Sequence, residues 1–482
     1  MTAGGPRRRT QVAVVGAGPV GLMLAGELRL GGADVLVLEA LDEPVTESRA
    51  STVHARTMEI FDERGLLDPL GRPPHERRGH FGGIPLDLGE LPSRYAGLWK
   101  VPQARLERLL AKWAGGLGAD LRRAHRVTGL DASAGEVRLT VAGPAGVVKV
   151  VADYVVGCDG ERSTVRDLAG IPLDGVGPTR RLIRADVAGV DIPNRRFQRL
   201  PGGLAIAART PDGVTRVMMA EHDGANDGPP PSFVDVVAVW RRLTGEDLAS
   251  GRPLWVNGFD DASRQARRYR SGRVLLAGDA AHQQMPVGGQ AMNLGLQDAV
   301  NLGWKLAATV AGRAAADLLD TYHAERYATG ARVLGNIRAQ SHLLLGGPQV
   351  EAARMLLTEL IAYPQVRDRL GGMISGLDVR YGDDPDPLVG RRMPAAPDAD
   401  WTAPLRAGRG ALLCSADDRS RRSGPAAALS GWIDRVRLAP VPPDPARPPA
   451  VLLRPDGHIA WTGDHHGDPR PALRRWFGAP AR

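Results

Sequence analysis

The chain has 482 residues, of which 43% are hydrophobic and 24% are charged, and its mean hydropathy is −0.20. At roughly 100–200 residues per domain it holds about two to four domains, and its composition excludes a disordered chain. No stretch approaches the roughly 18 consecutive apolar residues of a membrane span, so we expect no membrane partner. The two cysteines, Cys158 and Cys414, match no ligand spacing, which predicts no disulfide, no metal site and a cytoplasmic location.

The net charge of +8 and the pI near 9.9 raise the question of nucleic-acid binding. Only four of the 62 basic residues are lysines, and the arginines are distributed along the whole chain instead of forming one basic stripe. We therefore attribute the charge to a bias toward GC-rich codons and expect no nucleic-acid partner.

The amino-terminal segment has two interpretations. Residues 7–9 are arginines that precede an apolar stretch, as in a secretory signal. The same stretch also fits a strand at 11–15, a helix at 19–29 and a second strand at 34–38, which together form a βαβ unit. We favour the βαβ unit because its glycines stand at the spacing that such a unit uses to bind a dinucleotide.

These glycines are Gly16, Gly18 and Gly21, in the pattern G-x-G-x-x-G, and Glu39 ends the second strand. The first glycine permits a tight turn, the second lets the backbone approach a pyrophosphate, and the third allows close packing of helix on strand. The helix N-terminus then faces the anion, and Glu39 is placed to hold a ribose hydroxyl. The unit therefore predicts a bound dinucleotide.

Two later segments carry further motifs. Residues 153–166 form an apolar strand that runs into Asp159 and Gly160 and then into a helix. Residues 273–306 form a strand, a Gly-Asp pair at 278–279, a turn rich in proline and glycine, and an amphipathic helix.

The last of these segments, residues 273–306, favours a flavin. Asp279, at a strand end, is placed to accept hydrogen bonds from polyol hydroxyls, which a ribityl chain has and NAD lacks. Residues 286–290 bring backbone amides to a helix start, where they stabilise the negative charge that develops at N1 and the C2 carbonyl of a reduced flavin. FAD is therefore the predicted cofactor. Because only one G-x-G-x-x-G stands between a strand and a helix, any second dinucleotide is expected to bind only transiently.

In this order the motifs resemble the FAD-dependent aromatic hydroxylases of the para-hydroxybenzoate hydroxylase type, the class A flavoprotein monooxygenases. Within that family they are most similar to the hydroxylases that tailor aromatic polyketides such as angucyclines. Further similarity lies at residues 48–49, 55–59, 80–83, 101–103 and 452–457, so that the resemblance covers nearly the whole chain.

The resemblance implies which residues hold the cofactor. The residues assigned to the ADP half of FAD are Gly16, Gly18, Gly21, Glu39, Arg49 and Gln103. Those assigned to FAD and to the passage of NADPH are Asp159 and Gly160, and Asp279 is assigned to the ribityl and pyrophosphate region. Those assigned to the border of the isoalloxazine ring are Pro286, Gly288, Gly289 and Asn293.

Ala291 departs from the family pattern, which usually has a glycine at that place. Alanine is the better helix former, but its Cβ stands beside the expected flavin ring. The departure bears on the efficiency and the outcome of oxygen activation, not on FAD binding.

The resemblance implies a monooxygenase that consumes NADPH and molecular oxygen and hydroxylates an aromatic polyketide of the angucycline or anthracycline type, through a flavin C4a-hydroperoxide, in antibiotic biosynthesis. It requires no nucleophilic side chain. A catalytic base is not identified, and His80 and Arg56 are considered only because they are expected near the pocket. The open alternatives are a Baeyer–Villiger oxygenase of the same family and, because of Ala291, a reductase or non-oxygenating biosynthetic partner.

The predicted fold is α/β. A Rossmann-like (GR2-type) FAD-binding domain is expected at residues 1–177 and 266–395. A β-sheet substrate domain is inserted at 178–265, where short strands alternate with turns and form one wall of the substrate pocket. A monomer or a homodimer is expected.

The last segment, residues 400–482, resembles the thioredoxin-like C-terminal domain of larger family members. A strand is expected at 410–413, then a helix that ends near Trp432, and a further strand at 450–454. The segment contains no C-x-x-C, which excludes thiol redox chemistry. His465 and His466 have no third partner at ligand spacing, so a solvated loop is favoured over a metal site.

Overall fold

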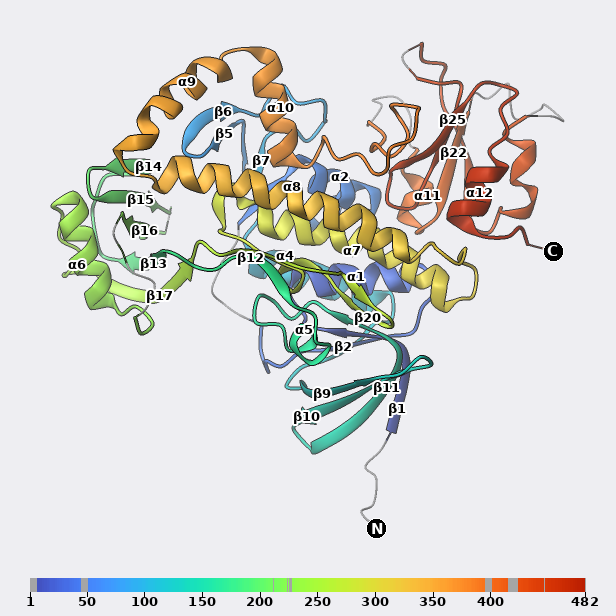
Figure 1. Cartoon of the computed structure of the whole chain (residues 1–482), viewed down its shortest axis with the longest axis horizontal. Coiled ribbons are helices and arrows are strands. Elements are labelled where there is room, and N and C mark those ends of the chain that lie inside the picture. The colour runs from blue at the N-terminus through green and yellow to red at the C-terminus, as the bar shows by residue number, and fades with distance from the viewer. Residues whose placement is uncertain are drawn as a thin grey trace.

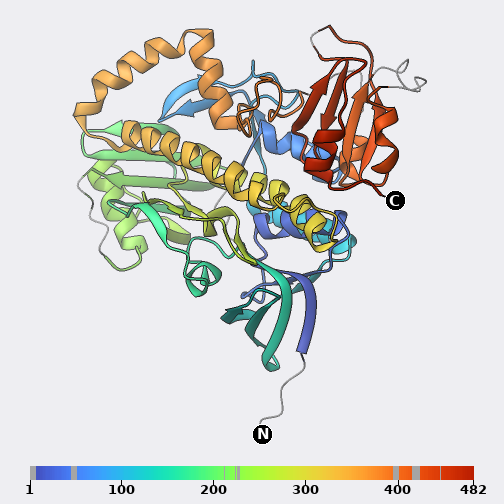
Figure 2. The same ribbon diagram turned by 45° about the vertical axis from the view of Figure 1, so that its right-hand side comes forward.

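The computed structural model describes residues 7–44, 51–210, 212–222, 224, 228–394, 401–414, 424–445 and 447–481. Arg49 lies outside these residues. Three sheets organise the molecule, a central one, a middle one and a C-terminal one (Figures 1 and 2). The helices α7 (Gln290–Val310) and α8 (Asp320–Leu345) cross the molecule between them.

The central sheet is mostly parallel, in the order β19-β20-β11-β1-β2-β8, with β10 and β9 added antiparallel to β11. Its strands are β1 (Arg7–Val15), β2 (Val35–Leu38), β8 (Asp120–Arg122), β9 (Arg126–Ala132), β10 (Val137–Gly143), β11 (Gly146–Gly157), β19 (Arg270–Ser271) and β20 (Val274–Leu276). The continuous apolar run 12–15 is buried because helices and strands cover both faces of this sheet. The predicted α/β fold is confirmed.

Glycines let the helices pack closely on this sheet. Helix α1 (Pro19–Leu30) crosses α4 (Gln103–Gly116) at Gly26, where an added Cβ would lie 2.0 Å from the Trp113 ring. It crosses α7 at Gly303, where a Cβ would lie 2.3 Å from Glu27 Cβ. The elements that complete this part are α2 (Ala55–Glu63), α3 (Leu67–Leu70), α5 (Thr164–Leu168), β3 (Thr52–His54), β4 (His75–Glu76) and β7 (Leu98–Lys100).

The middle sheet has the order β14-β15-β16-β13-β17 and is antiparallel. Its strands are β13 (Arg181–Ala188), β14 (Arg195–Leu200), β15 (Gly203–Arg209), β16 (Val214–Glu221) and β17 (Arg252–Asp260). Helix α6 (Phe233–Thr244) covers one face and buries Trp240 there. A capping box between Ser232 and Asp235 begins this helix, and left-handed Gly245 ends it.

The remaining strands connect the middle sheet to the rest of the molecule. Strands β12 (Leu173–Val176), β18 (Ser263–Ala266) and β21 (His282–Gln283) form a three-stranded sheet. The hairpin of β5 (Arg78–Phe81) and β6 (Ile84–Asp87) lies under the arch made by α9 (Glu351–Ile361) and α10 (Pro364–Ser375) (Figure 1).

The C-terminal sheet has the order β23-β22-β24-β25. Its elements are β22 (Gly410–Cys414), β23 (Val436–Pro440), β24 (Ala450–Leu453), β25 (Ile459–Gly463), α11 (Ala403–Arg406) and α12 (Arg470–Phe477). The expected helix ending near Trp432 is wrong, because this segment is a short 3-10 turn, Ala427–Gly431. The turn stops where the Trp432 indole points into the core and donates to the Gly478 carbonyl.

Buried ion pairs join the C-terminal sheet to the central part. The guanidinium of Arg454 donates to Glu325 Oε1 at 2.6 Å, and Lys305 Nζ donates to Glu325 Oε2 at 2.7 Å. The carbonyls of residues 455 and 456 accept hydrogen bonds from Arg64 and Arg56 at 2.9 and 2.8 Å. Since unpaired charges are costly in an interior, these contacts fix the C-terminal sheet against the central part.

This network predicts an acid-sensitive stability. Although burial opposes ionisation, Arg454 and Lys305 lower the pKa of Glu325 to about 2 from 4.5. Its contribution of about 3 kcal/mol is therefore present above pH 4.5 and is lost as the pH falls toward 2. Chemical unfolding across this range should show that Glu325→Gln has a flatter pH dependence and a lower stability near neutral pH. The matched control is Glu351→Gln on the surface, which should behave as wild type, and an unchanged pH dependence in Glu325→Gln would contradict the assignment.

Candidate functional site

A cavity of about 750 Å³ connects the glycine turn of the central sheet with the middle sheet. Of the residues predicted from the sequence, those that line it are Gly16, Gly18, Glu39, Gln103, Asp159, Gly160, Asp279, Pro286 and Ala291. Gly21, Gly288, Gly289 and Asn293 are not among the lining residues. Motifs that are far apart in the sequence therefore meet at one site, of a size common for small-molecule ligands.

The glycine turn joins β1 to α1 and leaves open space at its centre. Gly16 has φ +102°, and a Cβ there would lie 2.4 Å from the Cys158 carbonyl oxygen. A Cβ on Gly21 would lie 2.0 Å from the Gly16 oxygen, whereas a Cβ on Gly18 would meet no atom within 4 Å. Gly16 and Gly21 are thus required by the protein's own packing, and Gly18 leaves its backbone accessible to a ligand.

Glu39 lies at the end of β2, beside this turn. Its carboxylate accepts hydrogen bonds from the backbone amides of Ala17, at 2.7 Å, and Leu41, at 2.9 Å. Gln103 begins α4 nearby and donates to Glu107, whose pKa is raised by burial. The acidic residue therefore braces the glycine turn as well as lining the cavity.

Asp159 follows β11 and caps a helix. It accepts hydrogen bonds from Ser163 Oγ at 2.5 Å and from the Val165 amide at 3.0 Å. Burial raises the pKa of this carboxyl, and the hydrogen bonds from Ser163 and Val165 oppose that shift. Its side chain thus fixes the start of α5 and holds Gly160, with φ +80°, at the cavity wall.

Asp279 lies in the 3-10 turn η1 (Gly278–Ala280) and is exposed to the cavity. Buried Asp298 of α7 holds this turn, since its carboxylate accepts from the Gly278 amide at 3.1 Å and lies 2.7 Å from His282 Nε2. Arg326 of α8 donates to the same carboxylate at 2.6 Å. Sequence reasoning missed this anchor, although Asp298 is the one acidic residue of α7.

The residues between η1 and α7 form a second turn, η2 (Val287–Gly289), in which Gly288 and Gly289 have φ of +66° and +67°. Asn293 holds it in place, because its side chain donates to the Gly289 carbonyl at 2.8 Å and accepts from the His54 amide at 2.9 Å. The His54 ring donates to the Gly288 carbonyl at 2.9 Å, and burial lowers the pKa of His54 to about 4. Asn293 therefore shapes the turn from behind.

Ala291 lies in the first turn of α7 and lines the cavity beside Pro286 and Met292. Its methyl group belongs to the helix and is partly exposed. The extra Cβ therefore causes no local crowding of the protein and projects toward the ligand space.

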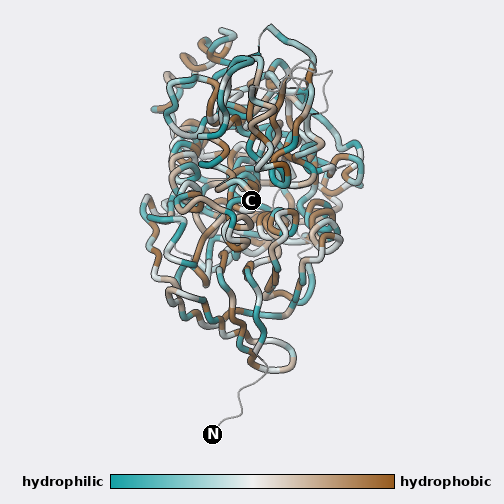
Figure 3. The backbone as a smooth tube through the Cα atoms, turned by 90° about the vertical axis from the view of Figure 1, so that its right-hand side faces the viewer, coloured by the Kyte–Doolittle hydropathy of each residue, from teal (hydrophilic) through white to brown (hydrophobic). Residues whose placement is uncertain are grey.

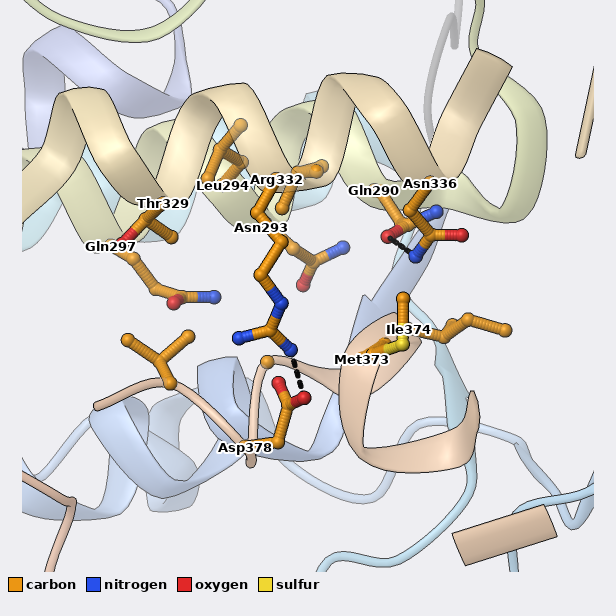
Figure 4. Close-up of a pocket in the computed structure, with 13 residues that line it drawn as sticks. Gln290, Asn293, Leu294, Gln297, Thr329, Arg332, Asn336, Met373, Ile374 and Asp378 are labelled. Carbon is orange, nitrogen blue, oxygen red and sulfur yellow. Dashed lines mark hydrogen bonds and ion pairs between the residues drawn. The ribbon is translucent and has the colours of Figure 1, made fainter. Parts of the chain in front are cut away.

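A smaller cavity lies on the opposite side of the first turn of α7 (Figure 4). Gln290 accepts a hydrogen bond from Asn336 there at 3.4 Å, and Arg332 and Asp378 form an ion pair across it. Among the described residues, Gln290 Nε2 is buried without a hydrogen-bond partner. A buried unpaired amide costs about 1–3 kcal/mol.

This unpaired nitrogen gives a direct test. Gln290→Met keeps the shape of the side chain and removes both the unpaired donor and the acceptor of the long, 3.4 Å hydrogen bond from Asn336. Because the two effects oppose each other, the free energy of unfolding should change by less than about 1 kcal/mol. The control is Gln340→Met, because the Gln340 amide donates to Asn336 and accepts from the Gly82 amide. Denaturant titration of both variants should show a clear loss only for Gln340→Met, and a similar loss for Gln290→Met would contradict the view that Nε2 is unpaired.

The middle sheet contributes the other wall of the large cavity. Residues of this sheet that the sequence did not single out are Arg184, Asn257, Phe259 and Asp260, and the neighbouring three-stranded sheet adds Arg264 and, directly after β21, Gln284. Alternation of apolar residues along short strands predicts a sheet but does not tell which face meets a ligand.

The two residues considered as bases do not reach this cavity. Arg56 is buried and forms an ion pair with Glu63 at 2.7 Å in the network beneath the C-terminal sheet. His80 packs its ring on Phe197, 3.9 Å between centroids, and burial lowers its pKa to about 3. The expectation that either lies at the pocket is wrong, because ion pairing and packing against other parts of the chain hold both side chains elsewhere.

The site suits FAD. The glycine turn, with open space at Gly18, fits a pyrophosphate, and the N-terminus of α1 stands behind it. Glu39, Gln103 and Asp279 line the same cavity and offer polar side chains for the hydroxyl groups of such a cofactor. Among the described residues no group of three potential ligands could hold a metal ion. Hydrophobic and hydrophilic residues are mixed along the whole chain (Figure 3). In the described ranges no helix is long and apolar enough to cross a membrane.

One cavity thus brings together a Rossmann-type glycine turn, the acidic residue at the end of the second strand, and the middle sheet. This combination is typical of a flavoprotein oxidoreductase. Residues 9–336 match the FAD binding domain family, and residues 386–480 match the aromatic-ring hydroxylase C-terminal family. The chain therefore belongs to the FAD-dependent aromatic-ring hydroxylases, a family of monooxygenases. The predictions of a flavoprotein monooxygenase and of FAD as its cofactor are confirmed.

Individual relatives are similar over their full length. The 12-dehydrotetracycline 5-monooxygenase/anhydrotetracycline 6-monooxygenase of Streptomyces rimosus is 43% identical, over 98% of this chain and 100% of its own. The dialkyldecalin synthase of Streptomyces rugosporus is 39% identical, over 98% and 99%. The structure of CabE, an aromatic hydroxylase from angucycline biosynthesis, matches with a TM-score of 0.92 and 47% identity, over 98% of this chain and 100% of CabE.

Proposed function

We propose that this enzyme hydroxylates an aromatic polyketide in antibiotic biosynthesis, with NADPH as electron donor and molecular oxygen as co-substrate. The observation that carries the proposal is a single cavity that runs from the glycine turn to the middle sheet. Gly16, Gly18 and Glu39 line it at the glycine turn, and Arg184 and Phe259 line it at the middle sheet. The names of the similar tetracycline monooxygenase and of CabE support this substrate class.

The residues at each end of the cavity would have separate tasks. FAD would be held by the backbone at Gly16 and Gly18, by Glu39 and Gln103, and by Asp279. The turn of residues 286–291 would face the flavin ring and direct its amides to the pyrimidine edge. When bound, the flavin supplies electron transfer and oxygen activation.

The protein itself supplies orientation and the exclusion of water. The middle sheet would place the aromatic ring against the turn of residues 286–291, and the buried clamp made by His54 and Asn293 keeps that turn rigid. NADPH would bind only transiently, because the one glycine turn is taken by FAD. We also propose the domain division at residues 177, 265 and 400, a monomer or homodimer, and a cytoplasmic location, which is consistent with a chain that has only two cysteines.

A second candidate function is a flavoprotein that does not oxygenate. Ala291, whose methyl group lines the cavity, and the similarity to a dialkyldecalin synthase favour it. A Baeyer–Villiger reaction on a ketone is a further outcome of the same site.

One experiment separates these functions. The purified holoenzyme is mixed with NADPH and a tetracyclic phenol under ¹⁸O₂, while NADPH and oxygen consumption are followed. Substrate-stimulated consumption and one ¹⁸O in an intact ring system would support hydroxylation, and a ring-expanded lactone would identify the Baeyer–Villiger reaction. Binding of the phenol without oxygen consumption, for a series of aromatic ligands, would overturn the monooxygenase proposal in favour of the non-oxygenating one.

A further inference from the structure

Arg184 stands out among the arginines that line the large cavity. It is 7% exposed, whereas Arg123 and Arg264 are half-buried and Arg126 and Arg162 are exposed. The guanidinium carbon of Arg184 lies 5.4 Å from the centroid of the Trp255 ring and 5.5 Å from that of Phe259. A buried guanidinium held between aromatic faces is both fixed in position and weakly hydrated.

The register of the sheet shows which way this side chain faces. Arg184 of β13 pairs with Asn257 of β17, and Leu182, on the same face, pairs with Phe259. Leu182 packs in one hydrophobic cluster with Val287, in the turn η2, and with Met285 just before that turn. The face that carries Arg184 therefore looks toward that turn.

The opposite face of β13 has a different role. Ile183, Ala185 and Val187 are buried against the inner side of α6. A ring bound between the middle sheet and the turn at Pro286 would thus meet Arg184 on the sheet side.

We propose that Arg184 binds the ionised hydroxyl of a phenolic substrate and holds it as the phenolate. The inference rests on the proposed function and names the form in which the aromatic substrate is bound. The O–H bond of the phenol breaks, the proton leaves to water, and the electron pair stays on the oxygen beside the guanidinium. A positive group within about 4–6 Å lowers the pKa of an acid by about one to three units.

This assignment accounts for phenol activation without a dedicated base. A phenolate ring is richer in electrons than a phenol ring and reacts more readily with an electrophilic oxygen. Arg184 would do this by stabilising a charge and not by accepting a proton, because a guanidinium stays protonated in proteins. It would then be a catalytic residue in direct contact with the substrate.

The test measures the ionisation of a bound probe, without turnover. 2-Hydroxyanthraquinone, whose phenolate absorbs at longer wavelength, is titrated with pH on the oxidised holoenzyme by difference spectroscopy. Wild type should lower the pKa of the bound phenol by about one to two units relative to the free compound. Arg184→Gln should abolish this shift and weaken binding of the phenolate about tenfold or more, while Arg184→Lys should retain part of the shift.

Two controls keep the result interpretable. The O-methyl ether of the probe cannot ionise, so wild type and Arg184→Gln should bind it within about twofold of each other. Arg209→Gln changes an arginine at the end of β15 that pairs with Asp191 on the surface, and should behave as wild type.

Three results would overturn the inference. An unshifted phenol pKa on wild type, with normal binding, would refute the role of Arg184 and leave the proposed function intact. Equal losses of phenol and ether binding in Arg184→Gln would show that the residue only supports the wall. Failure of wild type to bind any polycyclic phenol or ether would contradict the proposed aromatic substrate, and therefore also the role of Arg184.

Discussion

Replacing Gly16 by alanine should yield a protein that unfolds at a clearly lower temperature and retains almost no flavin. The residue has φ +102°, where an L-residue is strained, and its Cβ would lie 2.4 Å from the Cys158 carbonyl oxygen. That contact is with the backbone of the residue directly after β11, whose own amide donates to the Val15 carbonyl of β1 at 2.8 Å and which therefore cannot move freely. The combined cost is about 2–4 kcal/mol, measured as the change in the free energy of unfolding of the flavin-free protein.

Gly18→Ala is the matched control for this prediction. Gly18 has φ −73° and ψ −179°, which alanine adopts without strain, and its Cβ would meet no protein atom within 4 Å. The flavin-free variant should therefore unfold as wild type does. Because the added methyl group projects where a pyrophosphate approaches, FAD affinity should fall by about tenfold or more in a fluorescence titration. Equal stability losses in both variants would contradict the account of this turn.

The second large effect is expected at Asp298. Although burial alone would raise it, Arg326 and His282 hold the pKa of Asp298 below its ordinary value. Asp298→Asn leaves the fully buried guanidinium of Arg326 without its counter-charge, so a loss of about 3–5 kcal/mol is expected in chemical unfolding. Since the same carboxylate holds the Gly278 amide, the variant should also bind FAD more weakly.

The control for Asp298, which lies on α7, is an exposed aspartate on the neighbouring helix α8. Asp320→Asn changes an exposed carboxylate that pairs with Arg270, and should alter stability by less than about 1 kcal/mol. A loss of stability in Asp298→Asn with unchanged FAD affinity would confine its role to the core. Unchanged stability would contradict the buried ion pair altogether.

The glycine turn could be predicted from the sequence because all its determinants are local. Gly16, Gly18 and Gly21 lie between one strand and one helix, and their spacing alone specifies which of them permits the turn and which faces a ligand. The end of the following strand at Glu39 follows from the same short-range pattern.

The clamp on the second turn could not be predicted in this way. His54 and Asn293 are 239 residues apart and meet only in the fold. Asn293 is a residue that the sequence assigns to the flavin border, and its side chain also takes part in hydrogen bonds with His54, Thr57, Thr52 and Gly289. Which face of the middle sheet meets the ligand, and hence Arg184, likewise depends on the pairing of strands and not on composition.

The ion pairs beneath the C-terminal sheet constrain how such enzymes can be recombined. Arg454 belongs to the last part of the chain, while Glu325 and Lys305 belong to helices of the FAD-binding part. A chimera that takes its last hundred residues from a relative would inherit one side of each buried pair and must supply the other. Exchange of this segment between relatives should therefore succeed only where both parents carry the same charges at these positions, whatever their substrates.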